Sequence, residues 1–530
     1  MTNSADPLAQ AYAALAEGRG NEACRFAQVA LQRDPTEPDA LLILATEAIG
    51  RGDLDLTKRL CASARSASQN ETGWLLAIEG RVALALKQID TARTKARAAA
   101  VAGAPDAHVA NEIGVLLARV GLHKPALVFQ KYAAEEQPER ADYQYNLATA
   151  LQTTGDLTGA KKAFVRATRI DPSLSDAWLG LARLETDPED AWISQLEMAF
   201  EDANDGEDKL VLGHALSRML EEQCRWDRAL EWLDRAKLSS PNVGKFDRRA
   251  VALVFSAAIK SAEAKIATEV ADAGRVLFVS GLPRSGTTLV QRILDSHPRT
   301  QSRGETPEWI LALGRRFGKD GIDALDAELI GDGSTTDDLL SVGDDYLTRI
   351  GVNPADTGKL VIDKTPFNIF YAPAILRALP GAQILCLKRS PFDVAFGIYR
   401  QLFGPDFADY HFSLDFAETV HFVARFEEMV RRFEEELPHT RFTTVEYEKV
   451  VDDLEGQARQ MLEFARLDWD PGCVEFHKNP RPTATASAAQ VREPIYSSAV
   501  ERWRRYRLGS QRAIAEFAKY GITPPLADGQ

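Results

Sequence analysis

The chain contains 530 residues, which at about 150 residues per domain allows two to four domains and excludes a single small fold. Apolar residues make up 45% and charged residues 26% of the sequence, values typical of globular proteins, so a disordered or collagen-like chain is excluded. The net charge of -14 argues against a nucleic-acid-binding protein, and any anionic ligand must therefore meet a local basic site.

The N-terminus and the cysteines indicate in which cellular compartment the protein is expected. Residues Met1–Gln10 lack the basic and then apolar pattern of a signal sequence, and no run of about 18 apolar residues occurs anywhere. We therefore expect a cytoplasmic protein without a membrane partner. The cysteines are odd in number and scattered without a CxxC pair, so we expect neither disulfides nor a structural metal site (Cys24, Cys61, Cys224, Cys386 and Cys473).

Four glycines set a period close to 34 residues in the first third of the chain. Gly18, Gly52, Gly121 and Gly155 are 34, 69 and 34 residues apart, and Lys87 stands near the position where a further glycine would fall. Alanines follow these five positions by five or twelve residues, and prolines follow three of them by seventeen (Ala23, Ala126 and Ala160; Ala30, Ala64, Ala99, Ala133 and Ala167; Pro35, Pro138 and Pro172).

This pattern predicts stacked helical hairpins, because glycine permits a tight turn, alanine permits close helix packing and proline ends a helix. Residues Asp6–Leu174 resemble tetratricopeptide repeats. A weaker copy around Leu210–Leu238 has Cys224 where glycine is expected, so we predict an α-solenoid over residues 1–240. Two interpretations stay open: the array is a packed scaffold, or it is a groove that holds a protein, a peptide or a second copy of the chain.

The pattern changes after residue 273. Short apolar runs rich in β-branched and aromatic residues now alternate with helical segments (Arg275–Ser280, Leu360–Ile362, Ile384–Leu387 and Phe442–Val445). We therefore expect a P-loop-like α/β domain with a mainly parallel sheet over residues 273–530, after a helical linker over 241–272. Its ligands should bind at the carboxyl ends of the strands.

The first of these strands leads into the loop Gly281–Thr288, whose sequence is GLPRSGTT. A glycine-containing turn between a strand and a helix directs backbone N–H groups at an anion. The spacing fits a Walker A loop, but Thr287 occupies the position of the lysine that contacts the phosphates of a nucleoside triphosphate, so Arg284 is the available cation. A loop whose glycines serve packing alone is the other interpretation.

The loop, together with Asp295-Ser296-His297-Pro298, resembles the sulfotransferase superfamily, and most of all tyrosylprotein sulfotransferases and bacterial proteins that join tetratricopeptide repeats to such a domain. The resemblance spans Val276 to about Tyr506. It implies that the donor is 3′-phosphoadenosine 5′-phosphosulfate (PAPS) and that the loop binds the 5′-phosphosulfate (Arg284, Ser285, Gly286, Thr287 and Thr288). The sequence shows no carboxylate-rich metal cluster, so we expect no metal.

The resemblance also implies three catalytic residues. Glu305, in the pair Gly304-Glu305, matches the catalytic base of the family, and Glu308 is the competing carboxylate. Lys364, after a predicted strand, matches a lysine beside the sulfuryl group, and Arg284 neutralises charge there. Outside this context Glu305 and Lys364 would be interpreted as exposed surface charges.

Other residues are implied in donor binding. Arg389 matches the arginine that binds the 3′-phosphate, but Gly397 and Gln401 stand where the family has serine and arginine, which leaves the strength of this site open. Further donor contacts are implied for Tyr447, Ser487, Gln490 and Arg502, and a core phenol is the alternative for Tyr447. Residues 481–512 contain seven Arg and two Glu, a basic stretch that suits a polyanionic nucleotide, although a solvated helix face is the alternative.

We therefore expect sulfuryl transfer to an acceptor hydroxyl, either a tyrosine of a protein or peptide or a small phenol. Two other classes stay open. A P-loop nucleotide kinase is disfavoured by Thr287, and a repeat scaffold with an inactive sulfotransferase-like domain is suggested by Gly397 and Gln401.

Overall fold

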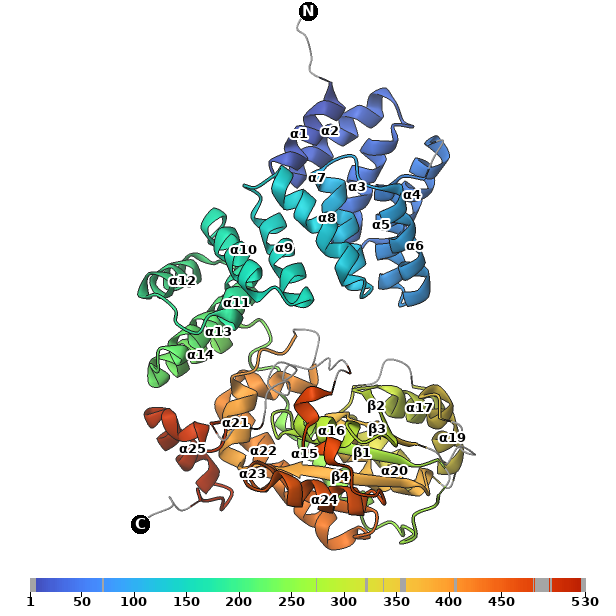
Figure 1. Cartoon of the computed structure of the whole chain (residues 1–530), viewed down its shortest axis with the longest axis vertical. Coiled ribbons are helices and arrows are strands. Elements are labelled where there is room, and N and C mark those ends of the chain that lie inside the picture. The colour runs from blue at the N-terminus through green and yellow to red at the C-terminus, as the bar shows by residue number, and fades with distance from the viewer. Residues whose placement is uncertain are drawn as a thin grey trace, which may run out of the picture. The chain divides into compact units, whose positions relative to one another are not determined.

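The computed structural model describes residues 6–68, 71–272, 274–319, 323–336, 338–352, 359–404, 408–479, 481, 495 and 498–525. The chain divides into two compact units, Met1–Arg225 and Trp226–Gln530. Figure 1 shows that the first unit consists of helices and that the second contains a sheet with helices around it. Both predicted fold types, an α-solenoid and an α/β domain with a parallel sheet, are therefore present.

The first unit is built from antiparallel helical hairpins. Each of the first five hairpins pairs an odd-numbered helix with the next one, and α11 and α12 both pack against α13. The helices are α1 (Pro7–Ala16), α2 (Gly20–Arg33), α3 (Pro38–Gly50), α4 (Leu54–Ala67), α5 (Gly73–Ala85), α6 (Ile89–Ala102), α7 (Ala107–Arg119), α8 (His123–Glu136), α9 (Ala141–Thr154), α10 (Leu157–Ile170), α11 (Ser175–Leu184), α12 (Asp190–Asp202) and α13 (Gly206–Glu222).

The turn positions of the predicted repeat share one backbone conformation. The four glycines have positive φ, between 75° and 98°, and so do the two residues that replace glycine, Lys87 at 59° and Cys224 at 57°. The repeat alanines are buried, with 7% exposure or less (Ala23, Ala30, Ala64, Ala99, Ala126, Ala133, Ala160 and Ala167). The 34-residue period is therefore confirmed as a period of tight turns and closely packed helices.

One long-range contact joins the beginning of this unit to its fifth hairpin. Arg140, just before α9, donates hydrogen bonds to the carbonyl oxygens of Leu15 and Ala16 at the end of α1. Its guanidinium also pairs with Asp142 at 2.5 Å and lies 4.4 Å above the ring of Tyr143. The last carbonyls of a helix have no partner within the helix, so Arg140 completes the hydrogen bonding of α1.

The second unit begins one helix earlier than the array was expected to end. Helix α14 (Trp226–Ser239) has the expected small residues, but it packs within the second unit against α25 (Arg507–Ala518). Asp234 of α14 accepts a hydrogen bond from Tyr399 and pairs with Arg512 at 3.0 Å. The expected linker, residues 241–272, contains α15 (Arg248–Ser261), which packs into the core of this unit.

The sheet of the second unit is parallel in every pairing, with the strand order β2-β3-β1-β4-β5. The strands are β1 (Val276–Gly281), β2 (Thr300–Gly304), β3 (Leu360–Asp363), β4 (Ala382–Lys388) and β5 (Phe442–Glu446). The first, third, fourth and fifth were predicted from their apolar runs. The edge strand β2, with the sequence TQSRG, was missed because Gln301 and Arg303 are exposed and the strand lacks an apolar run.

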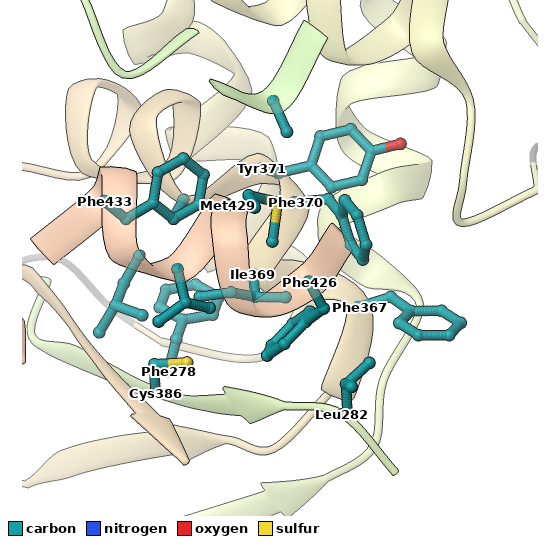
Figure 2. Packing of buried hydrophobic residues seen from close by; sticks show 14 of the residues in the cluster. Phe278, Leu282, Phe367, Ile369, Phe370, Tyr371, Cys386, Phe426, Met429 and Phe433 are labelled. Carbon is teal, nitrogen blue, oxygen red and sulfur yellow. The ribbon is translucent and has the colours of Figure 1, made fainter. Parts of the chain in front are cut away.

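Hydrophobic cores cover both faces of the sheet, because successive strand residues point to opposite sides. Val276 and Phe278 belong to one cluster, and Leu277 and Val279 belong to the other. Figure 2 shows part of the first cluster, where Phe278 and Cys386 of the sheet lie near Phe426 of α22.

The helices of the second unit connect and cover these strands. Besides α14, α15 and α25, they are α16 (Thr287–Asp295), α17 (Glu308–Arg316), α18 (Ala327–Thr335), α19 (Leu339–Arg349), α20 (Ala372–Ala378), α21 (Pro391–Tyr399), α22 (Phe416–Glu436), α23 (Tyr447–Asp452) and α24 (Leu454–Phe464), with 3-10 turns at η1 (Pro366–Tyr371), η2 (Ala408–Leu414), η3 (Pro471–Cys473), η4 (Phe476–Lys478) and η6 (Arg502–Arg505). Among the residues of the described ranges, no helix is long and apolar enough to span a bilayer.

Candidate active site at the carboxyl ends of the strands

The carboxyl ends of the five strands meet at one edge of the sheet, because all pairings are parallel. One residue singled out in the sequence follows each strand: Arg284 after β1, Glu305 after β2, Lys364 after β3, Arg389 after β4 and Tyr447 after β5. The fold thus brings together, at this edge, five residues that lie up to 163 positions apart in the chain.

The loop between β1 and α16 has a backbone shape that depends on glycine. Gly281 and Gly286 have φ of 147° and 107°, and Arg284 between them has φ of 71°. A Cβ at Gly286 would lie 2.5 Å from the ring of Tyr447, and a Cβ at Gly281 would lie 2.8 Å from the carbonyl oxygen of Leu387. The loop therefore packs directly against the ends of β4 and β5, and its glycines serve packing as well as the turn.

Three of the predicted loop residues are buried. Ser285 is 1% exposed, and its hydroxyl donates to the carbonyl oxygen of Leu282 at 2.7 Å, so it stabilises the loop from within. Thr287 and Thr288, which are 5% and 7% exposed, form the first turn of α16. First-turn amides have no partner within a helix, and the positive end of the helix dipole favours an anion here.

Arg389 is held in place from several sides. Its guanidinium lies 4.4 Å above the ring of Tyr447, and its Nη1 donates to the carbonyl oxygen of Arg284 at 3.0 Å. The other terminal nitrogen donates to the carbonyl oxygen of Ala499 and lies 3.6 Å from the carboxylate of Asp393. Arg389 thus connects the ends of β1, β4 and β5, and its side chain remains 12% exposed.

Asp393 was not singled out from the sequence, although its spacing from Arg389 is that of an ion pair on one helical turn. Its carboxylate accepts the backbone N–H groups of Glu501 at 2.8 Å and Trp503 at 3.1 Å. Burial raises the pKa of Asp393, while Arg389 and these amides act in the opposite direction. Asp393 therefore attaches the C-terminal segment to the start of α21.

Glu305 and Lys364 form an ion pair at the ends of β2 and β3. The Lys364 side chain is 1% exposed and the Glu305 side chain is 48% exposed, so the pair extends from the protein interior to the surface. Burial lowers the pKa of Lys364, and the neighbouring carboxylate of Glu305 opposes this shift. The competing carboxylate, Glu308, lies instead 3.6 Å from Arg349.

The two departures from the family pattern have structural settings of their own. Gly397 lies on α21, and a Cβ at this position would come within 2.9 Å of the Cβ of Arg284. The side chain of Arg284 therefore fills the space that a side chain at position 397 would need. The side-chain amide of Gln401 donates to the carbonyl oxygen of Leu402 at 3.0 Å, and the backbone carbonyl oxygen of Gln401 accepts from the buried Lys237 at 3.2 Å.

The remaining predicted donor contacts are Arg502, which lies beside an aromatic ring, and two residues outside the described ranges. Arg502 lies 5.4 Å from the ring of Trp226 on α14. Ser487 and Gln490 fall outside the described residues. Four arginines of the basic stretch pair with carboxylates, which fits the solvated-face interpretation for these four (Arg481 with Asp295, Arg504 with Glu501, Arg507 with Asp227 and Arg512 with Asp234).

The fold and this edge define the second unit as a doubly wound α/β domain with a site at the ends of its parallel strands. Residues 277–471 match the model of the sulfotransferase family, so this part of the chain is a sulfotransferase-family domain. An uncharacterized protein of Aquifex aeolicus is 28% identical over 71% of this chain, and the chain spans half the length of that relative. Protein-tyrosine sulfotransferase 1 of Danio rerio is 26% identical over 46% of this chain and 70% of its own length.

Solved structures similar to each unit are also known. The sulfotransferase domain from the curacin biosynthetic pathway is 17% identical, with a TM-score of 0.33, over 48% of this chain and 99% of its own. The tetratricopeptide protein YrrB is 17% identical, with a TM-score of 0.25, over 39% of this chain and 96% of its own.

Proposed function

We propose that this chain is a sulfotransferase that moves a sulfuryl group from PAPS to an acceptor hydroxyl. The observation that carries the proposal is the position of the Glu305–Lys364 pair within a sulfotransferase-family domain, at the same sheet edge as the loop after β1. Such a transfer needs a loop that binds the donor, a cation beside the sulfuryl group and a carboxylate that takes the acceptor proton.

The proposed chemistry requires positioning and charge stabilisation more than covalent chemistry by the protein. A bond forms between the acceptor oxygen and sulfur while the bond from sulfur to the bridging oxygen of the donor breaks, which leaves adenosine 3′,5′-bisphosphate. Glu305 takes the acceptor proton. Lys364 and Arg284 neutralise the negative charge that develops on the sulfuryl and bridging oxygens.

The donor would be held by the loop after β1 and by Arg389 after β4. Thr287, Thr288 and the amides of the loop suit the 5′-phosphate, because they combine hydroxyls with the N-terminus of a helix. Arg389 suits the 3′-phosphate, because its planar and permanently charged guanidinium is held rigidly beside the loop. Donor contacts by Arg502, Ser487 and Gln490 stay predictions.

We further propose a phenolic acceptor, either a small phenol or a tyrosine of a protein or peptide. Support for a tyrosine comes from the relatives that are named protein-tyrosine sulfotransferases. The repeat array of the first unit would then hold a macromolecular acceptor. A cytoplasmic location and self-association of the chain stay predictions.

Nucleotide binding by the full chain tests the proposal. Adenosine 3′,5′-bisphosphate without metal should raise the melting temperature, since a ligand at about 100 times its Kd adds about 2.7 kcal/mol of stability. Incubation with PAPS and tyramine should release adenosine 3′,5′-bisphosphate and form tyramine sulfate. Preferred binding of ATP with Mg²⁺ would indicate a kinase instead, and binding of neither nucleotide would indicate a scaffold.

A further inference from the structure

A network of hydrogen bonds centred on Thr365 connects the ends of three strands. The amide of Thr306, next to Glu305, donates to the hydroxyl of Thr365 at 3.0 Å. That hydroxyl also lies 3.0 Å from the carbonyl oxygen of Thr306 and 2.7 Å from the carboxylate of Asp363. The carbonyl oxygen of Thr365 accepts from the hydroxyl of Ser280, the residue before Gly281, at 3.1 Å.

The hydroxyl of Thr365 both accepts and donates in this network. A threonine hydroxyl has one hydrogen and two lone pairs, so it accepts from Thr306 N–H and donates to one of the two nearby oxygens. The other oxygen of the Asp363 carboxylate accepts from the hydroxyl of Tyr346 at 2.8 Å. Asp363 and Tyr346 are both 0% exposed, so Thr365 is attached to a rigid part of the core.

The neighbours of Thr365 and Thr306 in the chain are the two members of the ion pair. Lys364 precedes Thr365 and Glu305 precedes Thr306, and the amide of Lys364 donates to the carbonyl oxygen of Gly304 at 2.8 Å. One backbone bond, from Lys364 to Gly304, and one bond from the backbone of Thr306 to the Thr365 hydroxyl therefore join the two segments on either side of the pair. Removing the Thr365 hydroxyl would break the bond to Thr306, the residue after Glu305. The bond between the Lys364 amide and Gly304 would remain.

We propose that Thr365 is a positioning residue, whose hydroxyl, held by Asp363 and Tyr346, sets the place of Glu305 relative to Lys364. The inference rests on the proposed function of that pair. Thr365 itself contacts neither donor nor acceptor in this proposal. Thr365 therefore affects the reaction only through the position of Glu305.

The test uses the full chain with PAPS and tyramine. Thr365→Val, which keeps the shape and loses the hydroxyl, should lower kcat roughly 10- to 100-fold, as expected when a catalytic group is displaced by a fraction of an ångström to an ångström. The Kd of adenosine 3′,5′-bisphosphate should not change, which also shows that the variant is folded. Thr365→Ser, which keeps the hydroxyl, should retain most of the wild-type kcat.

Two further measurements separate positioning from a general structural role. In the Glu305→Gln background, Thr365→Val should cause little additional loss, because residues that act through one group are not additive. Hydrogen exchange in the peptide covering residues 300–309 should be faster in the unliganded Thr365→Val variant than in wild type or Thr365→Ser. This last measurement does not depend on activity.

Three results would overturn the inference while leaving the proposed function standing: equal losses for the Val and Ser variants, losses that multiply with Glu305→Gln, or unchanged exchange at residues 300–309. A wild-type chain that binds adenosine 3′,5′-bisphosphate without transferring a sulfuryl group, or that does not bind it, would instead overturn the proposed function. The two failures are therefore distinguishable.

Discussion

At the residue scale, the Glu305–Lys364 pair makes the most direct prediction. Glu305→Gln keeps the shape of the side chain and removes the proton acceptor. With tyramine as acceptor, kcat should fall roughly 10²- to 10⁴-fold, the usual contribution of a positioned base, while binding of adenosine 3′,5′-bisphosphate persists. Glu308→Gln is the matched control and should be mild, because Glu308 lies beside Arg349 instead of Lys364.

The choice of phenol sharpens this measurement. The tyramine hydroxyl is protonated at neutral pH and needs a base, whereas 4-nitrophenol is largely ionised in mildly alkaline buffer. Glu305→Gln should therefore lower the rate with 4-nitrophenol much less than the rate with tyramine. Equal losses with both phenols, or a larger loss for Glu308→Gln, would show that Glu305 is not the base.

Gly397 gives a second prediction at this scale. A Cβ at position 397 would lie 2.9 Å from that of Arg284, so Gly397→Ser should displace Arg284 and weaken adenosine 3′,5′-bisphosphate, with a cost of about 1–3 kcal/mol as for other overpacked sites. Gly397→Ala is the matched control, because it adds the Cβ without the hydroxyl. If Ser binds the nucleotide more tightly than Gly while Ala binds it more weakly, a serine hydroxyl is a productive ligand here.

Asp363 predicts a pH dependence of stability. Burial raises its pKa to about 6 from an ordinary value of 3.8, so between these values the folded chain keeps a proton that the unfolded chain has lost. The resulting stability is full below about pH 4 and is lost as the pH rises through 6. Asp363→Asn cannot ionise and should abolish this loss, which is on the order of 3 kcal/mol from the size of the shift.

Urea unfolding of the second unit at several pH values between 4 and 7 measures this effect. The exposed Asp344 on α19 provides the control, and Asp344→Asn should leave the pH dependence of the wild type unchanged. An equal change of the unfolding free energy with pH in the wild type and in Asp363→Asn would contradict the prediction.

At the scale of elements, the turn between α5 and α6 contains a residue whose backbone conformation is unfavourable, and one substitution can remove this strain. Lys87 has φ of 59°, a conformation that is unfavourable for residues with a Cβ. Lys87→Gly should raise the unfolding free energy of the first unit by about 0.5–1 kcal/mol in urea titrations. The reverse change at the equivalent turn, Gly121→Ala, should lower it, since Gly121 has open space around it and φ of 81°. A lower unfolding free energy for Lys87→Gly, or a higher one for Gly121→Ala, would contradict the repeat alignment.

Much of the fold could be predicted because the sequence repeats its physical requirements. The turn positions gave the hairpins, and the apolar runs gave four strands, whose ends then placed Arg284, Lys364, Arg389 and Tyr447. Glu305 was placed by resemblance alone, since the polar strand β2 before it shows no apolar run. Thr365 and Asp393 could not be predicted, because their roles depend on bonds to residues 59 and 108 positions away.

At the scale of the whole molecule, the position of α14 decides where the chain can be divided. Leu230 and Leu233 of α14 belong to the core of the second unit, so a fragment that begins at Trp226 keeps this core complete. We expect that fragment to bind adenosine 3′,5′-bisphosphate and sulfate tyramine as the full chain does. A fragment that begins at Arg248 lacks α14 and should be less stable in thermal denaturation.

The same fragment tests the role proposed for the repeats. If the array holds a macromolecular acceptor, the fragment beginning at Trp226 should lose activity on that acceptor and keep its activity on tyramine. Equal activity of fragment and full chain on the protein acceptor would assign the array a role other than acceptor binding.

The contact of Arg140 with the end of α1 has a consequence for how the first unit folds. In a simple repeat array each hairpin contacts only its neighbours, so unfolding can begin at one end and proceed hairpin by hairpin. Here a contact between residues 125 positions apart joins the first hairpin to the fifth. Fraying of α1 then breaks bonds made by the start of α9, so the first five hairpins share one cooperative transition, and closing that long loop slows their folding.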